Sequence, residues 1–127
     1  MKVLLIEDNE QNRYLATFLL EQRGFTVVHA ASGLAGIERA AAETFSMILL
    51  DIQLPGMDGY AVARALRGNA ALVEVPIVAV TSYAMAGDRE KSLAAGCDGY
   101  LEKPINPETF VDDISQFLRP SGKAGTP

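Results

Sequence analysis

Five short apolar runs, separated by longer amphipathic segments, constrain the fold of this chain more than any other feature. The runs are Lys2–Ile6, Thr26–Ala30, Phe45–Leu50, Val75–Val80 and Asp98–Leu101. Three of them are nearly continuous in valine, isoleucine and leucine, which is typical of parallel strands that helices cover on both faces. Because strand and helix alternate five times, the sequence predicts an α/β fold with an open parallel sheet and right-handed crossovers.

The segments between the runs have apolar residues at helical spacing. The residues that share one apolar helical face are Leu15, Phe18 and Leu19 in the first segment, Leu34, Ile37 and Ala41 in the second, and Phe110, Ile114, Phe117 and Leu118 in the last.

Glycine and polar residues mark the expected helix ends. Gly24 and Gly96 are placed to end the first and fourth helices in the left-handed conformation. Ser32 and Asn106 are placed to cap the second and fifth helices at their N-termini. The third helix is expected to end early, at the stretch that begins with Gly68.

Length and composition indicate one domain. The chain has 127 residues, of which 49% are apolar, so it can bury a core without a disulfide or a structural metal. Residues 1–119 are expected to form this domain and residues 120–127 a disordered tail. The single cysteine, Cys97, permits no intramolecular disulfide.

Charge and the N-terminal run restrict partners and location. The formal net charge is −5 and lysine and arginine do not cluster, so direct binding of DNA or RNA is not expected. The run at the N-terminus stops at Glu7 and is too short to cross a bilayer, and no segment resembles a signal peptide. A cytoplasmic protein without membrane contact is the simplest expectation.

Polar residues that can carry chemistry follow four of the five runs. Glu7 and Asp8 follow the first, Asp51 the third, Thr81 the fourth and Lys103 the fifth. In open α/β sheets, ligands bind outside the carboxyl ends of the strands, so these side chains are expected to converge. Taken singly, a strand-end acid is as readily a helix cap, and a lone lysine is usually solvated; the combination points to a site.

The three acids would repel one another at such an edge. At about 4 Å and an effective dielectric near 20, each pair costs on the order of 4 kcal/mol. Mg²⁺, which prefers carboxylate and carbonyl oxygens, would offset this repulsion, as would the ammonium of Lys103. A hydroxyl, an ammonium and a divalent cation around one carboxylate suit phosphoryl transfer, with that carboxylate as the nucleophile.

Four stretches resemble the receiver domain of bacterial two-component response regulators. They are Leu4–Asn9, Leu49–Gly59, Pro76–Thr81 and Gly99–Ile105. The resemblance covers residues 2 to about 118, and the residues after Glu7 and Asp51 are most similar to single-domain regulators and to receivers of hybrid kinases. It implies a doubly wound, flavodoxin-like five-stranded parallel sheet of strand order 2-1-3-4-5, flanked by five helices.

The family's site roles carry over residue by residue. The resemblance implies that Asp51 is the phosphoacceptor. Asp8 and Asp51 would ligate Mg²⁺, Glu7 would do so mostly through water, and Gln53 would contribute its backbone carbonyl. Glu7 replaces the family's more common aspartate, which a water-mediated contact should tolerate.

The resemblance also implies a switch. Thr81 and Lys103 would bind the phosphoryl group, and Thr81 would act together with Tyr100. Gln53 and Tyr83 would modulate the lifetime of the phosphoryl group. The peptide bond after Lys103 is expected to be cis, and Ser82 stands where the family usually has a small alanine.

The implied function is a phosphoacceptor switch of a phosphorelay. The donor would be a histidine kinase or a histidine phosphotransfer protein, and a downstream protein would bind the face formed by the fourth helix, the fifth strand and the fifth helix. One alternative is a phosphorylation-independent interaction module on the same scaffold. Another is an aspartate-nucleophile phosphatase, which Gln53 disfavours because such enzymes have a second acid at this position. No turnover as an enzyme is expected, beyond assistance with the domain's own phosphorylation and dephosphorylation.

Overall fold

The fold is described from a computed structural model of the chain, which describes residues 1–54, 56–82 and 87–118. Strands and helices alternate throughout these residues. In chain order they are β1 (Lys2–Ile6), α1 (Glu10–Gln22), β2 (Thr26–Ala30), α2 (Gly33–Ala42), β3 (Met47–Asp51), α3 (Gly59–Arg67), the 3-10 turn η1 (Ala70–Leu72), β4 (Ile77–Thr81), α4 (Asp88–Ala94), β5 (Gly99–Glu102) and α5 (Phe110–Ser115).

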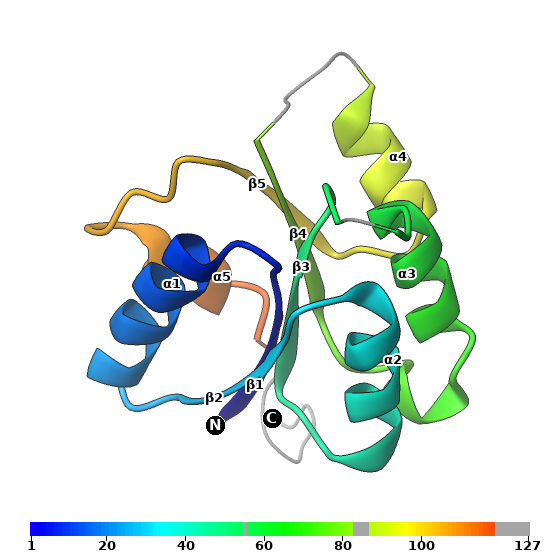
Figure 1. The fold of residues 1–127 in the computed structure, drawn as a ribbon, viewed down its shortest axis with the longest axis horizontal. Coiled ribbons are helices and arrows are strands. Elements are labelled where there is room, and N and C mark those ends of the chain that lie inside the picture. Colours follow the sequence, from blue (N-terminus) through cyan, green and yellow to red (C-terminus); the bar gives the residue numbers. More distant parts are fainter. Residues whose placement is uncertain (55, 83–86, 119–127) are drawn as a thin grey trace.

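The strands form one parallel sheet in the order β2-β1-β3-β4-β5. Helices α1 and α5 cover one face, and α2, α3 and α4 cover the other (Figure 1). Because these strands are parallel neighbours, the carboxyl ends of β1, β3 and β4 meet at one edge of the sheet, which is the upper edge in Figure 1. The predicted doubly wound sheet of order 2-1-3-4-5 with five flanking helices is confirmed.

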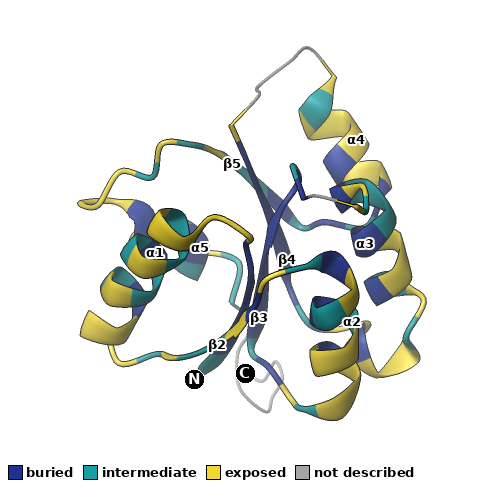
Figure 2. Cartoon of the chain, in the orientation of Figure 1, coloured by how far each residue is buried: buried dark blue, intermediate teal, exposed yellow. Residues whose placement is uncertain are grey.

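Both faces of the sheet carry a hydrophobic core. Leu50 and Val62 belong to the core beneath α2, α3 and α4, whereas Leu49 and Ile114 belong to the core beneath α1 and α5. Every residue of β3 and β4 is buried, as Figure 2 shows along the middle of the sheet. This two-sided burial is the reason why these strands have continuous rather than alternating apolar sequences.

The bounds of three strands differ from the prediction by one or two residues. β3 begins at Met47 rather than Phe45, β4 at Ile77 rather than Val75, and β5 at Gly99 rather than Asp98. Phe45 and Val75 are apolar because they pack against the core from the turns before their strands. Periodicity alone does not separate such residues from the strand that follows.

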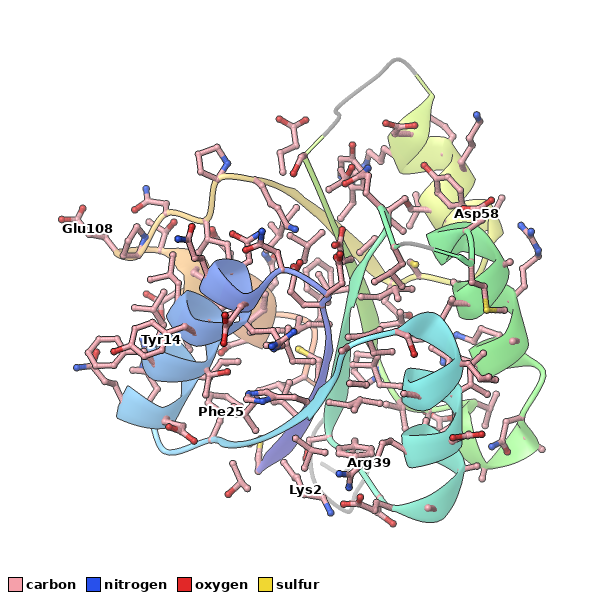
Figure 3. All side chains as sticks on the ribbon, in the orientation of Figure 1. Lys2, Tyr14, Phe25, Arg39, Asp58 and Glu108 are labelled. Carbon is pink, nitrogen blue, oxygen red and sulfur yellow. The ribbon has the colours of Figure 1, made fainter. Side chains whose placement is uncertain are left out.

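Two large side chains on the predicted apolar helical faces are exposed rather than packed against the sheet. Phe18 is 48% exposed and Leu34 is 63% exposed. Phe18 instead stacks on Tyr14, with ring centroids 6.4 Å apart, and Tyr14 points away from the sheet on the outer side of α1 (Figure 3). Helix α2 buries the small residues Gly33, Gly36 and Ala40. It lies so close to β1 that a side chain on Gly36 would collide with Ile6.

Most predicted helix ends are confirmed. Gly24 and Gly96 have φ angles of +90° and +110°, in the left-handed region, and α3 ends at Gly68. The hydroxyl of Ser32 accepts a hydrogen bond from the N–H of Ala35 at 3.1 Å.

The predicted cap of the last helix was wrong. Helix α5 begins only at Phe110, and its N-cap residue is Thr109. Asn106 begins a separate turn, in which its side chain accepts a hydrogen bond from the N–H of Glu108 at 3.0 Å. The residues of the predicted tail, 120–127, and residue 119 lie outside the described part of the chain. Among the described residues, no helix has the length and hydropathy that crossing a membrane requires.

Candidate functional site

Three acidic side chains meet where β1 and β3 end. Glu7 and Asp8 directly follow β1, and Asp51 is the last residue of the neighbouring β3. One carboxylate oxygen from each lies within 4.8 Å of those of the other two. Glu7 and Asp51 are buried, whereas Asp8 is exposed. Among the described residues, this is the group of acids with metal-binding geometry.

Lys103 brings a positive charge to the same cluster. Its Nζ atom lies 2.8 Å from Glu7 Oε1 and 3.5 Å from Asp51 Oδ2. The backbone positions it, because the N–H of Lys103 donates to the carbonyl of Thr81 at 2.7 Å. The Lys103–Pro104 peptide bond is cis, as predicted.

Asp51 is held in an environment that disfavours its charge. The pKa of this carboxyl is raised to about 7, first because it is buried and then because Glu7 is negatively charged nearby. Lys103 and the backbone N–H of Gln53, which donates to Asp51 Oδ1 at 3.0 Å, lower the pKa and only partly offset these effects. A cation that binds next to Asp51 would therefore stabilise the ionised carboxylate.

The donor set suits a hard divalent cation such as Mg²⁺. All three acids offer oxygen, the ligand atom this ion prefers. Both oxygens of Glu7 are already engaged, one with Lys103 and the other with the N–H of Asn9 at 3.2 Å. Among the described residues, the carboxylate of Asp8 makes no such contact and is exposed, so it is the more accessible of the two to a cation.

Helix α1 and the residues before it hold the acidic loop in place. Asn9 caps α1 by accepting a hydrogen bond from the N–H of Asn12 at 2.9 Å. Arg13, one turn into α1, donates to the backbone carbonyls of Glu7 at 3.1 Å and Asp8 at 3.2 Å. Sequence reasoning did not find the role of Arg13, although its position one turn after a strand-end acid pair was a usable signal.

The loop after Asp51 is fixed by the start of α3. Asp58 is the N-cap residue of α3, and its Oδ1 accepts from the N–H of Tyr60 at 2.9 Å (Figure 3). A Cβ on Gly59 would lie 2.5 Å from the Cα of Ile52, so the helix can approach the loop closely only with glycine here. Asp58 and Gly59 together therefore fix the loop after Asp51 against the start of α3.

Thr81 ends β4 beside this loop and is 1% exposed. The side-chain amide of Gln53 donates to the Thr81 hydroxyl, and the N–H of Ser82 donates to Gln53 Oε1 at 2.9 Å. Tyr100 lies on β5, where it pairs with Ala79 of β4 and is half-buried. The sequence predicted Gln53 and Thr81 in one site but not the hydrogen bond between their side chains.

The structure thus brings together Glu7, Asp8, Asp51, Gln53, Thr81 and Lys103 at one edge of the sheet. Tyr100 lies on the adjoining edge strand. Tyr83 lies outside the described residues, so its place relative to the site stays a prediction.

The fold and the acid cluster at the strand ends define a signalling receiver. The family model of the response regulator receiver domain matches residues 3–115, and the chain therefore belongs to that family.

Among curated proteins, the chain is similar to the polar-differentiation response regulator DivK of Brucella ovis. The two are 37% identical over 116 residues, which cover 91% of this chain and 94% of the relative. The expected similarity to a single-domain regulator is confirmed.

Solved structures agree with this assignment. The chemotaxis protein CheY4 of Vibrio cholerae superimposes with a TM-score of 0.87 at 29% identity, covering 92% of this chain and 98% of that one. The receiver domain of a sensor histidine kinase from Pseudomonas aeruginosa has a TM-score of 0.84 at 34% identity, covering 91% and 95%. That receiver holds a magnesium ion in its active-site cleft.

Proposed function

We propose that this chain is a phosphoacceptor switch of a two-component phosphorelay and that Asp51 accepts the phosphoryl group. The observation that carries the proposal is the setting of Asp51: a buried carboxylate at a strand end, within reach of two further acids and one lysine. A histidine kinase or a histidine phosphotransfer protein is the donor, and the protein acts in the cytoplasm without binding nucleic acid or membrane.

The chemistry is transfer between two side chains. An oxygen of Asp51 attacks the phosphorus of a phosphohistidine, the O–P bond forms, the P–N bond breaks, and the imidazole leaves. Lys103 stabilises the charge on the transferred group, as does the hydroxyl of Thr81 when it donates to a phosphoryl oxygen. Asp8, Asp51 and the backbone carbonyl of Gln53 would hold Mg²⁺ directly and Glu7 through water, and the ion would supply further electrostatic stabilisation when bound.

Signalling follows from the position of Thr81 between Asp51 and β5. We propose that Thr81 moves toward the phosphoryl group and that Tyr100 responds, which changes the face formed by α4, β5 and α5 for a protein partner. The half-buried state of Tyr100 supports this proposal, because its ring can move inward if space is vacated. Gln53 and Tyr83 are proposed to set the lifetime of the phosphoryl group.

The arrangement favours a switch over the two alternatives. An aspartate-nucleophile phosphatase would need a second acid two residues after Asp51, and Gln53 stands there. A phosphorylation-independent interaction module would have no use for a buried, destabilised carboxylate that faces Lys103. We therefore propose that the chain assists its own phosphorylation and dephosphorylation but turns over no other substrate.

Labelling by a small phosphodonor in the presence of Mg²⁺ tests the assignment of Asp51. Wild-type protein should acquire an acid-stable, base-labile label, and Asp51→Asn should acquire none. Asp58→Asn is the matched control, because Asp58 caps α3 close to the site and is not proposed to react. Equal labelling of wild type and Asp51→Asn would rule the proposal out.

A further inference from the structure

The side-chain amide of Gln53 connects two loops that carry the site. Its two polar atoms form hydrogen bonds with two consecutive residues. Nε2 donates to the hydroxyl of Thr81, and Oε1 accepts from the backbone N–H of Ser82 at 2.9 Å. Gln53 belongs to the loop after β3, whereas Thr81 and Ser82 lie where β4 ends. The contact therefore links the residues next to Asp51 with the switch threonine.

The chemistry of the partners fixes the orientation of this amide. A backbone N–H can only donate, so the atom of Gln53 that faces Ser82 must be the oxygen. The nitrogen then faces Thr81 and donates to it. The Thr81 hydroxyl consequently uses a lone pair toward Gln53, and its own hydrogen is directed elsewhere as a donor.

We propose that Gln53 is a positioning residue that tethers Thr81 in its resting place and releases the Thr81–Ser82 turn when a phosphoryl group occupies Asp51. The proposal rests on the phosphoacceptor function proposed above and deepens it. Movement of the Thr81 hydroxyl toward Asp51 would separate it from Gln53 Nε2 and would shift the adjacent backbone at Ser82. The two hydrogen bonds of Gln53 could then not both be kept.

This assignment differs from a role of Gln53 in orienting water. Each polar atom of the amide already has a protein partner in the resting protein, so the orientation of the amide is set by Thr81 and Ser82. Gln53 then affects the phosphoryl lifetime through the position of Thr81. The two roles make different predictions for the unphosphorylated protein, in which no phosphoryl group is present for a water to attack.

Hydrogen exchange of the Ser82 amide, measured by NMR, reads the tether directly. Ser82 is exposed, so the described contact that protects its N–H is the one to Gln53 Oε1. In metal-free, unphosphorylated protein, Gln53→Met keeps the length of the side chain and removes both hydrogen bonds. The Ser82 amide should then exchange about fivefold to tenfold faster, as expected for the loss of one neutral hydrogen bond.

Two further variants make the result specific. Gln53→Glu keeps an oxygen that accepts from Ser82, so the Ser82 amide should remain protected even if the Met variant is disturbed in folding. Gln116→Met is the matched control, because Gln116 donates to the carbonyl of Asp113 on α5, far from the site in sequence. Its Ser82 exchange should equal that of wild type.

Loading wild-type protein with Mg²⁺ and beryllofluoride, a mimic of the phosphoryl group, tests the release. The Ser82 amide should become as fast as in unloaded Gln53→Met, and loading should change the Met variant little. Equal Ser82 exchange in wild type and Gln53→Met, or protection that persists after loading, would overturn the tether. Failure of the phosphoacceptor proposal is separate, since it would appear as absent labelling of Asp51 with the resting protection of Ser82 intact.

Discussion

Asp51 is the residue whose environment most affects both stability and chemistry. The pKa of its carboxyl in the fold is raised to about 7 from its ordinary value of 3.8, because burial and then Glu7 disfavour its charge. Between these two values the folded state binds more protons than the unfolded state. The free energy of unfolding therefore falls as pH rises through this window, and the loss is complete above it.

Asp51→Asn should relieve this cost in metal-free protein. The variant should gain on the order of 1 kcal/mol or more in free energy of unfolding at about pH 8, and clearly less at about pH 5. Urea unfolding of both proteins at the two pH values is the measurement. Mg²⁺ should shrink the difference by stabilising the ionised wild type, and a gain that is largest in acid would contradict the assigned pKa.

Asp8 and Glu7 are adjacent acids with different surroundings. Because Lys103 and the N–H of Asn9 already engage the Glu7 carboxylate, Asp8 should contribute more to Mg²⁺ binding. Asp8→Ala is expected to weaken Mg²⁺ affinity at least about tenfold, and Glu7→Gln by less. Calorimetric titration with Mg²⁺ measures both. Equal affinities of wild type and Asp8→Ala would show that the exposed carboxylate is no direct ligand.

At the scale of elements, Arg67 joins four segments on the face of the sheet that α2, α3 and α4 cover. Its guanidinium donates to the carbonyls of Gly96 at 2.7 Å, Leu72 at 2.7 Å and Val75 at 2.8 Å, and forms an ion pair with Asp98. These contacts connect α3, η1, the turn before β4 and the segment between α4 and β5.

Arg67→Met should destabilise the fold by about 2–4 kcal/mol, because it removes the ion pair with the partly buried Asp98 and the hydrogen bonds to three carbonyls. Arg64→Met on the exposed side of the same helix is the control and should change stability by no more than about 0.5 kcal/mol. Denaturant unfolding compares the two. Similar losses in both variants would mean that the Arg67 contacts contribute nothing specific.

The elements and the site acids were predictable because their signals are local. Apolar runs identify β3 and β4, and the edge where parallel strands end is fixed by their common direction, so Asp8, Asp51 and Thr81 could be placed together. The contacts of Arg67 were not predictable, since they join residues whose separation in the chain has no periodic signature. The exposure of Leu34 was missed because α2 approaches the sheet through glycine, which no apolar pattern reports.

At the scale of the whole molecule, the fold places reaction and recognition side by side. Asp51 ends β3, the central strand, and β4 separates β3 from the edge strand β5, which lies between α4 and α5 (Figure 1). A change at Asp51 therefore has one strand to cross before it reaches the face proposed for the partner. The net charge of −5 makes a protein a more suitable partner than a nucleic acid.

Phosphotransfer from the full set of histidine kinases and histidine phosphotransfer proteins of the source organism tests the central claim most directly. Each phosphorylated donor is mixed with wild-type protein or Asp51→Asn in Mg²⁺, and mass spectrometry locates the transferred group. At least one donor should pass its phosphoryl group to Asp51 of the wild type, and none to the variant. Transfer to Asp51→Asn as fast as to wild type, or no transfer from any donor, would contradict the account.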